Sequence, residues 1–276
     1  MVLSWPSMKV SHAGDVIVHT FSQSTEEVTV AQINFEELSM LYLDLMKKCL
    51  TRLSFPEKNR PFDQTARTEG RDWPAEAETM IGLTRLENLQ YCLTEAIRKG
   101  VPGDCIETGV WRGGASIFMR AVLKAYGDQS RTVWVADSFR GLPKPDGRYH
   151  QDQGDRYWEL SHFLGVPLEQ VQANFARYGL LDEQVRFLVG WFKDTLPTAP
   201  ISRLAVLRLD GDMYSSTMDA LKSLYDKVSP GGYVIIDDYG AVPNCKCAVD
   251  DFRSECQITE QLQQIDWTGV FWEKIR

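Results

Sequence analysis

Three aspartates follow two apolar segments in the last third of the chain. Asp210 comes directly after LAVLRL, and Asp237 and Asp238 come directly after YVII. If these segments are neighbouring parallel strands, the residues that follow them lie about 5 Å apart, and carboxylates that close repel one another unless a cation lies between them. An all-oxygen ligand set favours Mg²⁺, with Mn²⁺ or Ca²⁺ also compatible. The pattern predicts a divalent metal site, with Asp212 as an alternative ligand; in the competing interpretation some of these acids cap helices or face water.

A glycine-rich turn, ETGVWRGGAS, connects an apolar segment to a helical one. In open α/β sheets, ligands bind beside such turns, at the carboxyl ends of the strands. The G-x-G-x-x-G pattern of dinucleotide enzymes is absent, and Glu107 stands before the first glycine. An acid there would repel a pyrophosphate but suits an ammonium group, such as that of S-adenosylmethionine. The alternative is a tight turn that needs glycine for its geometry alone.

The next apolar segment, VWVAD, ends in a second acid, Asp137. An acid at this position accepts hydrogen bonds from the ribose hydroxyls of an adenosine. It could also be a solvated carboxylate or cap a helix together with Ser138. NAD enzymes carry such an acid too, so Asp137 indicates an adenosine and no particular cofactor.

Together these acids predict methyl transfer to a hydroxyl group. The hydroxyl of an alcohol has a pKa far above neutral, and a divalent metal would stabilise the alkoxide that attacks a sulfonium methyl group in line. A carboxylate at the same metal would accept the proton as general base. Asp210 is the predicted base, because its strand lies nearest the expected sulfonium.

The elements that must position these residues follow from the hydrophobic pattern. Helical periodicity covers residues 35–53 and 82–98, and Gly100 is placed to end the second helix. Short apolar segments then alternate with helical ones, which predicts a mostly parallel sheet with helices on both faces; the expected strands are 105–108, 133–137, 185–190, 204–210 and 233–237. The C-terminal QITEQLQQID and VFWEKIR predict an antiparallel hairpin at one edge. We therefore expect an N-terminal arm (1–34), a helical region (35–100) and an α/β core (101–276).

Composition excludes several classes of protein. The 276 residues are 43% hydrophobic and 25% charged, and 30 basic against 38 acidic residues give a net charge of −8. That balance argues against a nucleic-acid partner, which needs a basic surface. No apolar run approaches the roughly 18–20 residues of a membrane span, and no secretion signal is visible. Six cysteines then indicate reduced thiols in a cytoplasmic protein, and Cys245 and Cys247 lack the further ligands that zinc requires.

Longer motifs carry a family resemblance. The segments ETGVWRGGAS, VADSFRGLPKPD, RYGLLDEQVRFLVGWFKDTLPTAP, LAVLRLDGDMYSSTMDAL and SPGGYVIIDDYG resemble the macrocin-type O-methyltransferases of bacteria, which methylate sugar hydroxyls on antibiotics. The similarity runs from about Leu41 to the C-terminus and is dense from Glu78 to Tyr239.

The resemblance implies a class I S-adenosylmethionine-dependent methyltransferase fold, Rossmann-like, with a seven-stranded sheet and N-terminal helices. It implies Mg²⁺ at Asp210, Asp237 and Asp238, with Asp210 as general base, and a homodimer or larger homo-oligomer acting on a glycosylated small molecule. It also implies that residues 35–100 form a helical cap that serves in oligomerisation and as a lid over the active site. The residues that it implies for binding the methyl donor are Met80, Ile81, Glu107, Thr108, Gly109, Val110, Trp111, Ser116, Asp137, Ser138, Phe139, Gly190 and Trp191.

The acceptor is the least transferable part of the resemblance. Residues 147–166 lie where the family has a variable lid, and its aromatic residues could stack on a sugar ring; His150 and His162 could contact the acceptor or simply face the surface. The same acids also suit a phenol or a hydroxyl on a polyketide or peptide. From other classes, a nucleotide-binding module without turnover would be expected to lack one of the three aspartates, and the glycine pattern disfavours a dehydrogenase.

Overall fold

The computed structural model describes residues 9–10, 16–17, 34–58 and 61–276. Seven strands of these residues form one sheet in the order β5-β4-β3-β6-β7-β9-β8. Five are parallel: β3 (Asp104–Thr108), β4 (Val133–Asp137), β5 (Val185–Val189), β6 (Leu204–Leu209) and β7 (Val228–Ile236). The antiparallel pair β8 (Gln263–Gln264) and β9 (Val270–Glu273) extends the sheet beyond β7. The predicted mostly parallel sheet with a C-terminal hairpin is confirmed.

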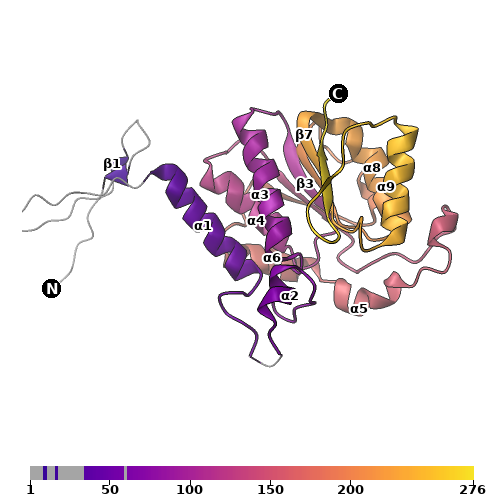
Figure 1. Ribbon diagram of the computed structural model, residues 1–276, viewed down its shortest axis with the longest axis horizontal. Coiled ribbons are helices and arrows are strands. Elements are labelled where there is room, and N and C mark those ends of the chain that lie inside the picture. Colours follow the sequence, from indigo (N-terminus) through magenta and orange to yellow (C-terminus); the bar gives the residue numbers. More distant parts are fainter. Residues whose placement is uncertain (1–8, 11–15, 18–33, 59–60) are drawn as a thin grey trace, which may run out of the picture.

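Helices cover both faces of this sheet (Figure 1). One face carries α3 (Gly82–Arg98), α4 (Gly114–Ala125) and α6 (Leu168–Arg177), with α1 (Phe35–Leu50) packed on α4. The other face carries α7 (Phe192–Thr195), α8 (Tyr214–Leu224), the short η3 (Tyr225–Lys227) and α9 (Pro243–Glu255). Alternate strand residues bury into the two layers, because successive side chains of a strand point to opposite faces. Val206 and Ile235 join the core under α3 and α4, and Leu207 and Val234 join the core under α8 and α9.

The N-terminal helices have identifiable ends. The Asn34 side chain accepts a hydrogen bond from the Glu36 N–H and caps α1, as short polar side chains do at helix starts. The helix ends at Leu50, three residues before the predicted end, and the Thr51 hydroxyl donates to the Lys47 carbonyl at 2.8 Å. Helix α3 has the predicted bounds and is followed by Gly100 with φ +63°. The predicted arm, 1–34, lies outside the described residues except for β1 (Lys9–Val10), β2 (Val16–Ile17) and Asn34.

The long polar connection between α1 and α3 is held by buried charges. It contains a short helix that the sequence did not predict, α2 (Gln64–Thr68). From α2, the buried Arg67 donates to the Thr51 carbonyl at 2.8 Å and to the Asp72 carboxylate at 2.7 Å. Glu57 accepts backbone N–H groups from Ala75 and Glu76 at 3.1 and 2.7 Å. Ion pairs and backbone hydrogen bonds therefore fix this connection beside the sheet.

The connection between β4 and β5 forms a second cover over the carboxyl ends of the strands. It contains η1 (His150–Asp152), η2 (Tyr157–Leu160) and α5 (Ser161–Leu164) before α6 begins. We call residues 141–166 the lid segment. Arg148 forms a two-pronged ion pair with Asp219 of α8, both distances 2.8 Å, and this pair ties the lid segment to the helix that follows Asp210. Among the described residues, no helix is long and apolar enough to cross a membrane.

Candidate active site

The three predicted aspartates meet at the carboxyl ends of two adjacent strands. Asp210 follows β6, and Asp237 and Asp238 follow β7, which is its parallel neighbour. One carboxylate oxygen from each residue lies within 4.8 Å of those from the other two. Asp237 and Asp238 are buried and Asp210 is partly buried. The sheet therefore assembles the predicted cluster at its ligand-binding edge.

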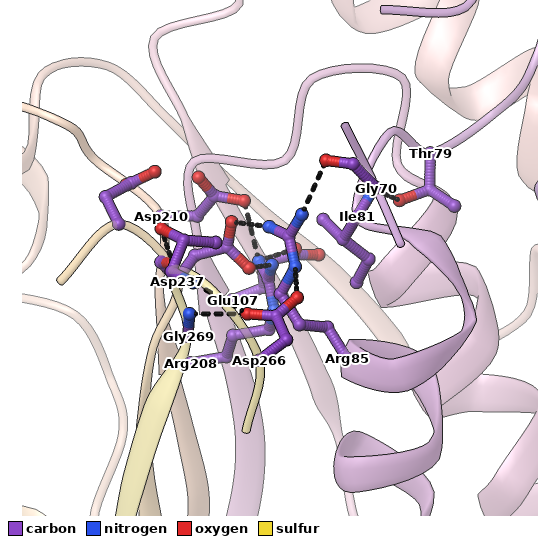
Figure 2. A network of polar contacts seen from close by, with 12 residues as sticks. Gly70, Thr79, Ile81, Arg85, Glu107, Arg208, Asp210, Asp237, Asp266 and Gly269 are labelled. Atoms are coloured by element: carbon purple, nitrogen blue, oxygen red, sulfur yellow. Dashed lines mark hydrogen bonds and ion pairs between the residues drawn. The ribbon is translucent and has the colours of Figure 1, made fainter. Parts of the chain in front are cut away.

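Two buried arginines, which the sequence reading missed, also enter this cluster (Figure 2). Arg208 of β6 donates to Glu107 at 2.6 Å, to Asp210 at 2.9 Å and to the Oδ1 of Asp237. Arg85 of α3 donates to the Oδ2 of Asp237 and to the Gly70 carbonyl, the latter at 3.1 Å. Part of the negative charge that predicted a metal is thus neutralised by the protein itself.

The acids of the cluster still outnumber its arginines, and the pKa values of Asp210, Asp212 and Asp238 are raised. Burial raises the pKa of Asp210 to about 6, with the neighbouring Asp237 adding to the shift. Burial, reinforced by Asp210 and Asp237, raises the pKa of Asp212 to about 8. Burial likewise raises the pKa of Asp238, with Asp212 and Asp210 contributing. Each of these shifts shows that the ionised form lacks sufficient compensation by solvent or positive charge.

The carboxylates of Asp210, Asp237 and Asp238 form a ligand set that fits a divalent cation. Asp237 has an arginine at each oxygen, but each carboxylate oxygen has a further lone pair available. Among the hydrogen bonds of the described residues, the carboxylate of Asp238 accepts only the Asp212 N–H, at 3.2 Å. Oxygen-only ligands with excess negative charge suit Mg²⁺ or a similar hard cation. Asp212 itself has φ +56° and lies beside the cluster as a further carboxylate.

The glycine-rich turn after β3 packs directly against the end of β6. Gly109 has φ +89°, and a Cβ added to it would lie 1.7 Å from the carbonyl oxygen of Asp210. Glycine is therefore required here for both its backbone conformation and its size. Asp137 from β4 closes the turn, since its carboxylate accepts the Val110 and Phe139 N–H groups at 2.8 and 2.7 Å. Both oxygens of Asp137 thus hold the backbone on either side of the turn.

Two adjoining cavities open at this edge, of about 260 and about 210 Å³. They share Gly109, Gly141, Leu142, Asp137 and Asp210. Of the residues predicted to bind the methyl donor, those lining the first cavity are Met80, Ile81, Glu107, Gly109, Val110, Trp111 and Asp137. Those lining the second are Gly109, Asp137, Ser138, Gly190 and Trp191.

Three of the predicted donor residues, Thr108, Ser116 and Phe139, line neither cavity. Thr108 is buried within β3. Ser116 donates its hydroxyl proton to Glu107. Phe139 packs against Phe187 at 6.3 Å between ring centroids, while its N–H holds Asp137. Their side chains therefore support the lining residues from behind.

The first cavity is also lined by aromatic and aliphatic side chains. Tyr157, Leu160 and Leu164 of the lid segment line it, together with Trp73 and Trp267. Trp73 stacks on Phe163 with ring centroids 5.1 Å apart and planes 11° apart. Trp73 and Trp267 are lining residues that sequence reasoning missed, because both come from connections without periodicity.

The two candidate histidines lie away from these cavities. His150 and His162 are exposed, and neither belongs to the lining of either cavity. The Nδ1 atom of His162 lies 3.0 Å from the Glu159 carbonyl oxygen, within its own helical turn. In this structure both histidines have surface positions.

The sheet order, the glycine-rich turn and the acids at the strand ends together define a class I S-adenosylmethionine-dependent methyltransferase fold. Comparison with solved structures agrees: the O-methyltransferase NovP superimposes with a TM-score of 0.84 at 54% identity, over 86% of this chain and 100% of that one. The macrocin O-methyltransferase family model matches residues 15–274. The chain therefore belongs to the macrocin O-methyltransferase family, and it is an S-adenosylmethionine-dependent O-methyltransferase.

Characterised relatives are similar over most of their length. The 8-demethyl-8-(2,3-dimethoxy-α-L-rhamnosyl)-tetracenomycin-C 4'-O-methyltransferase of Streptomyces olivaceus is 58% identical, over 86% of this chain and 94% of that protein. The demethyldecarbamoylnovobiocin O-methyltransferase of Streptomyces niveus is 53% identical, over 86% and 95%. The mycinamicin III 3''-O-methyltransferase of Micromonospora griseorubida is 50% identical, over 85% and 96%.

Proposed function

We propose that this enzyme methylates a sugar hydroxyl on a glycosylated natural product, with Mg²⁺ held by Asp210, Asp237 and Asp238. The observation that carries the proposal is the cluster of three carboxylates, with oxygens within 4.8 Å, in the wall of a cavity shared with the glycine-rich turn. The names of the relatives support the acceptor class, since one acts on a rhamnosyl tetracenomycin and another on mycinamicin III.

The methyl donor would span the two adjoining cavities. Glu107 and Trp111 line the first cavity and would face the amino-acid part of the donor, while Gly190 and Trp191 line the second and would face the adenine. Asp137 lines both cavities, where its carboxylate would accept hydrogen bonds from the ribose hydroxyls. This placement leaves the sulfonium near Asp210, which also lines both cavities.

The residues of this chain would then divide the chemistry among them. When bound, Mg²⁺ would lower the pKa of the acceptor hydroxyl by withdrawing charge from its oxygen. Asp210 accepts the hydroxyl proton as general base. The acceptor oxygen forms a bond to the methyl carbon as the carbon–sulfur bond breaks, which leaves a methyl ether and S-adenosylhomocysteine. The lid segment, through Tyr157 and Leu160, would exclude water from the reacting atoms.

The aromatic wall supports a sugar acceptor. Flat aromatic faces such as Trp73 and Trp267 pack against the apolar face of a sugar ring, while the carboxylates opposite bind its hydroxyls. An aglycone beyond the sugar would contact the lid segment. A phenol, or a hydroxyl on a polyketide or peptide, is the alternative acceptor.

A matched acceptor panel tests this proposal. The purified enzyme, S-adenosylmethionine and Mg²⁺ would be incubated with glycosylated natural products and with their aglycones, and methylated products detected by mass spectrometry. We expect methylation on the sugar of glycosides, abolished by EDTA and restored by added Mg²⁺. Methylation of aglycones alone would reject the sugar acceptor, and full activity in EDTA would reject the metal.

We also propose that the enzyme forms a homodimer or larger homo-oligomer. Large apolar side chains of α1 are exposed, among them Met40, Leu41 and Leu45, and Tyr91 of α3 lies beside them as part of the same surface hollow as Met40. Exposed apolar patches on a stable protein mark interaction surfaces. Light scattering after size-exclusion chromatography measures the oligomeric state directly, and a monomer across the micromolar range would contradict the proposal.

A further inference from the structure

Arg208 lies among Glu107, Asp210 and Asp237 (Figure 2). Its strand, β6, pairs with β3 on one side and β7 on the other. In the register of these strands, Glu107 of β3 is the direct neighbour of Arg208, and Ile235 of β7 is its neighbour on the other side. Side chains alternate along strands, so Glu107, Arg208 and Asp237 point to the same face of the sheet.

The guanidinium group of Arg208 contacts acids on both sides at once. Its Nη1 atom donates to Glu107 at 2.6 Å and to Asp210 at 2.9 Å, and its Nη2 atom donates to Asp237. The side chain is only 1% exposed. A guanidinium group buried this deeply is tolerated only where carboxylates pair with it, and its planar fork fixes the direction of each bond.

The acids on either side are also held from the helices. Glu107 accepts the Ser116 hydroxyl from α4, and Asp237 accepts Arg85 from α3. Arg85 in turn lies 3.0 Å from Asp266, in the turn before β9. Arg208 is therefore the central member of a continuous network that reaches from α4 to the C-terminal hairpin, while it lines neither cavity itself.

We propose that Arg208 is a positioning residue that fixes Glu107, on the donor side, relative to Asp210 and Asp237, on the metal side. The inference rests on the proposed function, which assigns those acids to the two ligands. Because one planar group holds all three carboxylates, its loss changes the geometry of both binding sites together. Lysine would keep the charge but not the fork, so it would not replace arginine.

The test is to compare Arg208→Lys with the wild-type enzyme in two binding measurements. Calorimetry would give the affinity for S-adenosylhomocysteine, and electron paramagnetic resonance of free Mn²⁺ would give the affinity for metal. Changing groups that orient metal ligands typically weakens metal binding about 10–100-fold, and we expect at least the lower value for both ligands. Arg120→Lys is the matched control, because Arg120 is a buried arginine of α4 that forks onto Asp182 away from the site; it should change neither affinity.

The outcomes separate this inference from the proposed function. Absence of Mn²⁺ binding by the wild type would overturn the metal site and this inference with it. If the wild type binds Mn²⁺ and Arg208→Lys keeps the wild-type affinity for both Mn²⁺ and S-adenosylhomocysteine, only the inference about Arg208 is overturned. The same holds if Arg208→Lys loses affinity for just one of these two ligands. If Arg208→Lys does not fold, Glu107→Gln decides: the network predicts weaker Mn²⁺ binding although Glu107 is not one of the three metal ligands, and an unchanged affinity would contradict it.

Discussion

At the scale of single residues, the glycine-rich turn after β3 meets the aspartate cluster at Gly109. Its backbone conformation is left-handed, and the space where a Cβ would lie is occupied by the Asp210 carbonyl. The turn can approach the end of β6 only because this residue has no side chain. The position of Asp210 and the shape of the two cavities that Gly109 lines therefore depend on one glycine.

We expect Gly109→Ala to change both the position of Asp210 and the shape of the adjoining cavities. The left-handed backbone alone costs about 1–3 kcal/mol for a residue with a side chain, and the contact with the Asp210 carbonyl must also be relieved by moving the backbone. Affinity for S-adenosylhomocysteine should fall about tenfold or more. The control is Gly127→Ala, which has φ +67° but no heavy atom within 4 Å of the added Cβ; it should lose stability without losing affinity. Equal affinities for the two variants would show that the close approach at Gly109 is unimportant.

The three aspartates of the site could be predicted from the sequence, whereas its two buried arginines, Arg85 and Arg208, could not. Asp210, Asp237 and Asp238 could be found because each directly follows an apolar strand segment, which places it at the sheet edge. Arg208 stands inside such a segment, and the pattern of the sequence does not show which buried acids it meets. Arg85 lies on a helix far away in the chain, so its contact with Asp237 depends on tertiary packing.

At the scale of elements, the lid segment is attached to the helix that follows the predicted catalytic base. The carboxylate of Asp152, which is 2% exposed, accepts the N–H groups of Tyr214 and Ser215 at 2.9 Å each. These are the first two residues of α8, whose N–H groups have no partner inside the helix. A residue of the lid segment thus caps α8 and fixes the segment over the site.

Asp152→Ala should free both the helix end and the lid segment. Loss of a helix cap costs about 1 kcal/mol, which corresponds to a fall in Tm of roughly 2–4 °C for a protein of this size. We also expect the KM for the acceptor to rise while the affinity for S-adenosylhomocysteine stays constant. Glu183→Ala, at an exposed residue outside the site, is the control for both measurements. An unchanged acceptor KM would indicate that the lid segment does not contact the acceptor.

Elements with strong periodicity could be predicted, and short ones could not. The pattern of apolar residues gave the bounds of α3, 82–98, because 17 residues contain enough turns to define a face. Helix α2 has five residues, too few to show a period, and it depends on the contacts of Arg67 for its place. The lid segment likewise consists of short helical turns that are fixed by contacts with α8, which no local pattern reveals.

At the scale of the whole molecule, the order of the strands could not be predicted although their presence could. Strand β3, first of the parallel strands along the chain, lies between β4 and β6, so that Glu107 meets Arg208 and Gly109 meets Asp210. The crossover between β5 and β6 carries the chain to the far side of β3. Local hydrophobic patterns show where strands form but not which strands lie next to one another. The division of the chain into arm, helical region and core stays a prediction.

The buried and partly buried acids of the site make the stability of the whole protein dependent on pH. Burial raises the pKa of Glu107, Asp210 and Asp212 to about 7, 6 and 8, against about 4 in an unfolded chain. Between about pH 4 and pH 8 the metal-free folded protein therefore holds more protons than the unfolded chain, and its stability falls as the pH rises through this window.

We expect Mg²⁺ to counter this loss, since at the proposed metal site it would bind the ionised acids of the folded state. Thermal unfolding in EDTA should give a lower Tm at about pH 8.5 than at about pH 5.5, and excess Mg²⁺ should raise the Tm mainly at the higher pH. The contrary finding would be a Tm in EDTA that rises between these two pH values, or an equal effect of Mg²⁺ at both.

The role of Asp210 is tested most directly by Asp210→Asn with an acceptor that the wild type methylates. Asparagine keeps the size of the side chain but cannot accept the hydroxyl proton, and general base catalysis contributes about 10²–10⁴-fold to a rate. We expect kcat to fall by at least about 100-fold, while calorimetry shows S-adenosylhomocysteine bound within about twofold of the wild-type affinity. Methyl transfer at the wild-type rate, with Mg²⁺ and S-adenosylmethionine supplied, would contradict the assignment of Asp210 as the base.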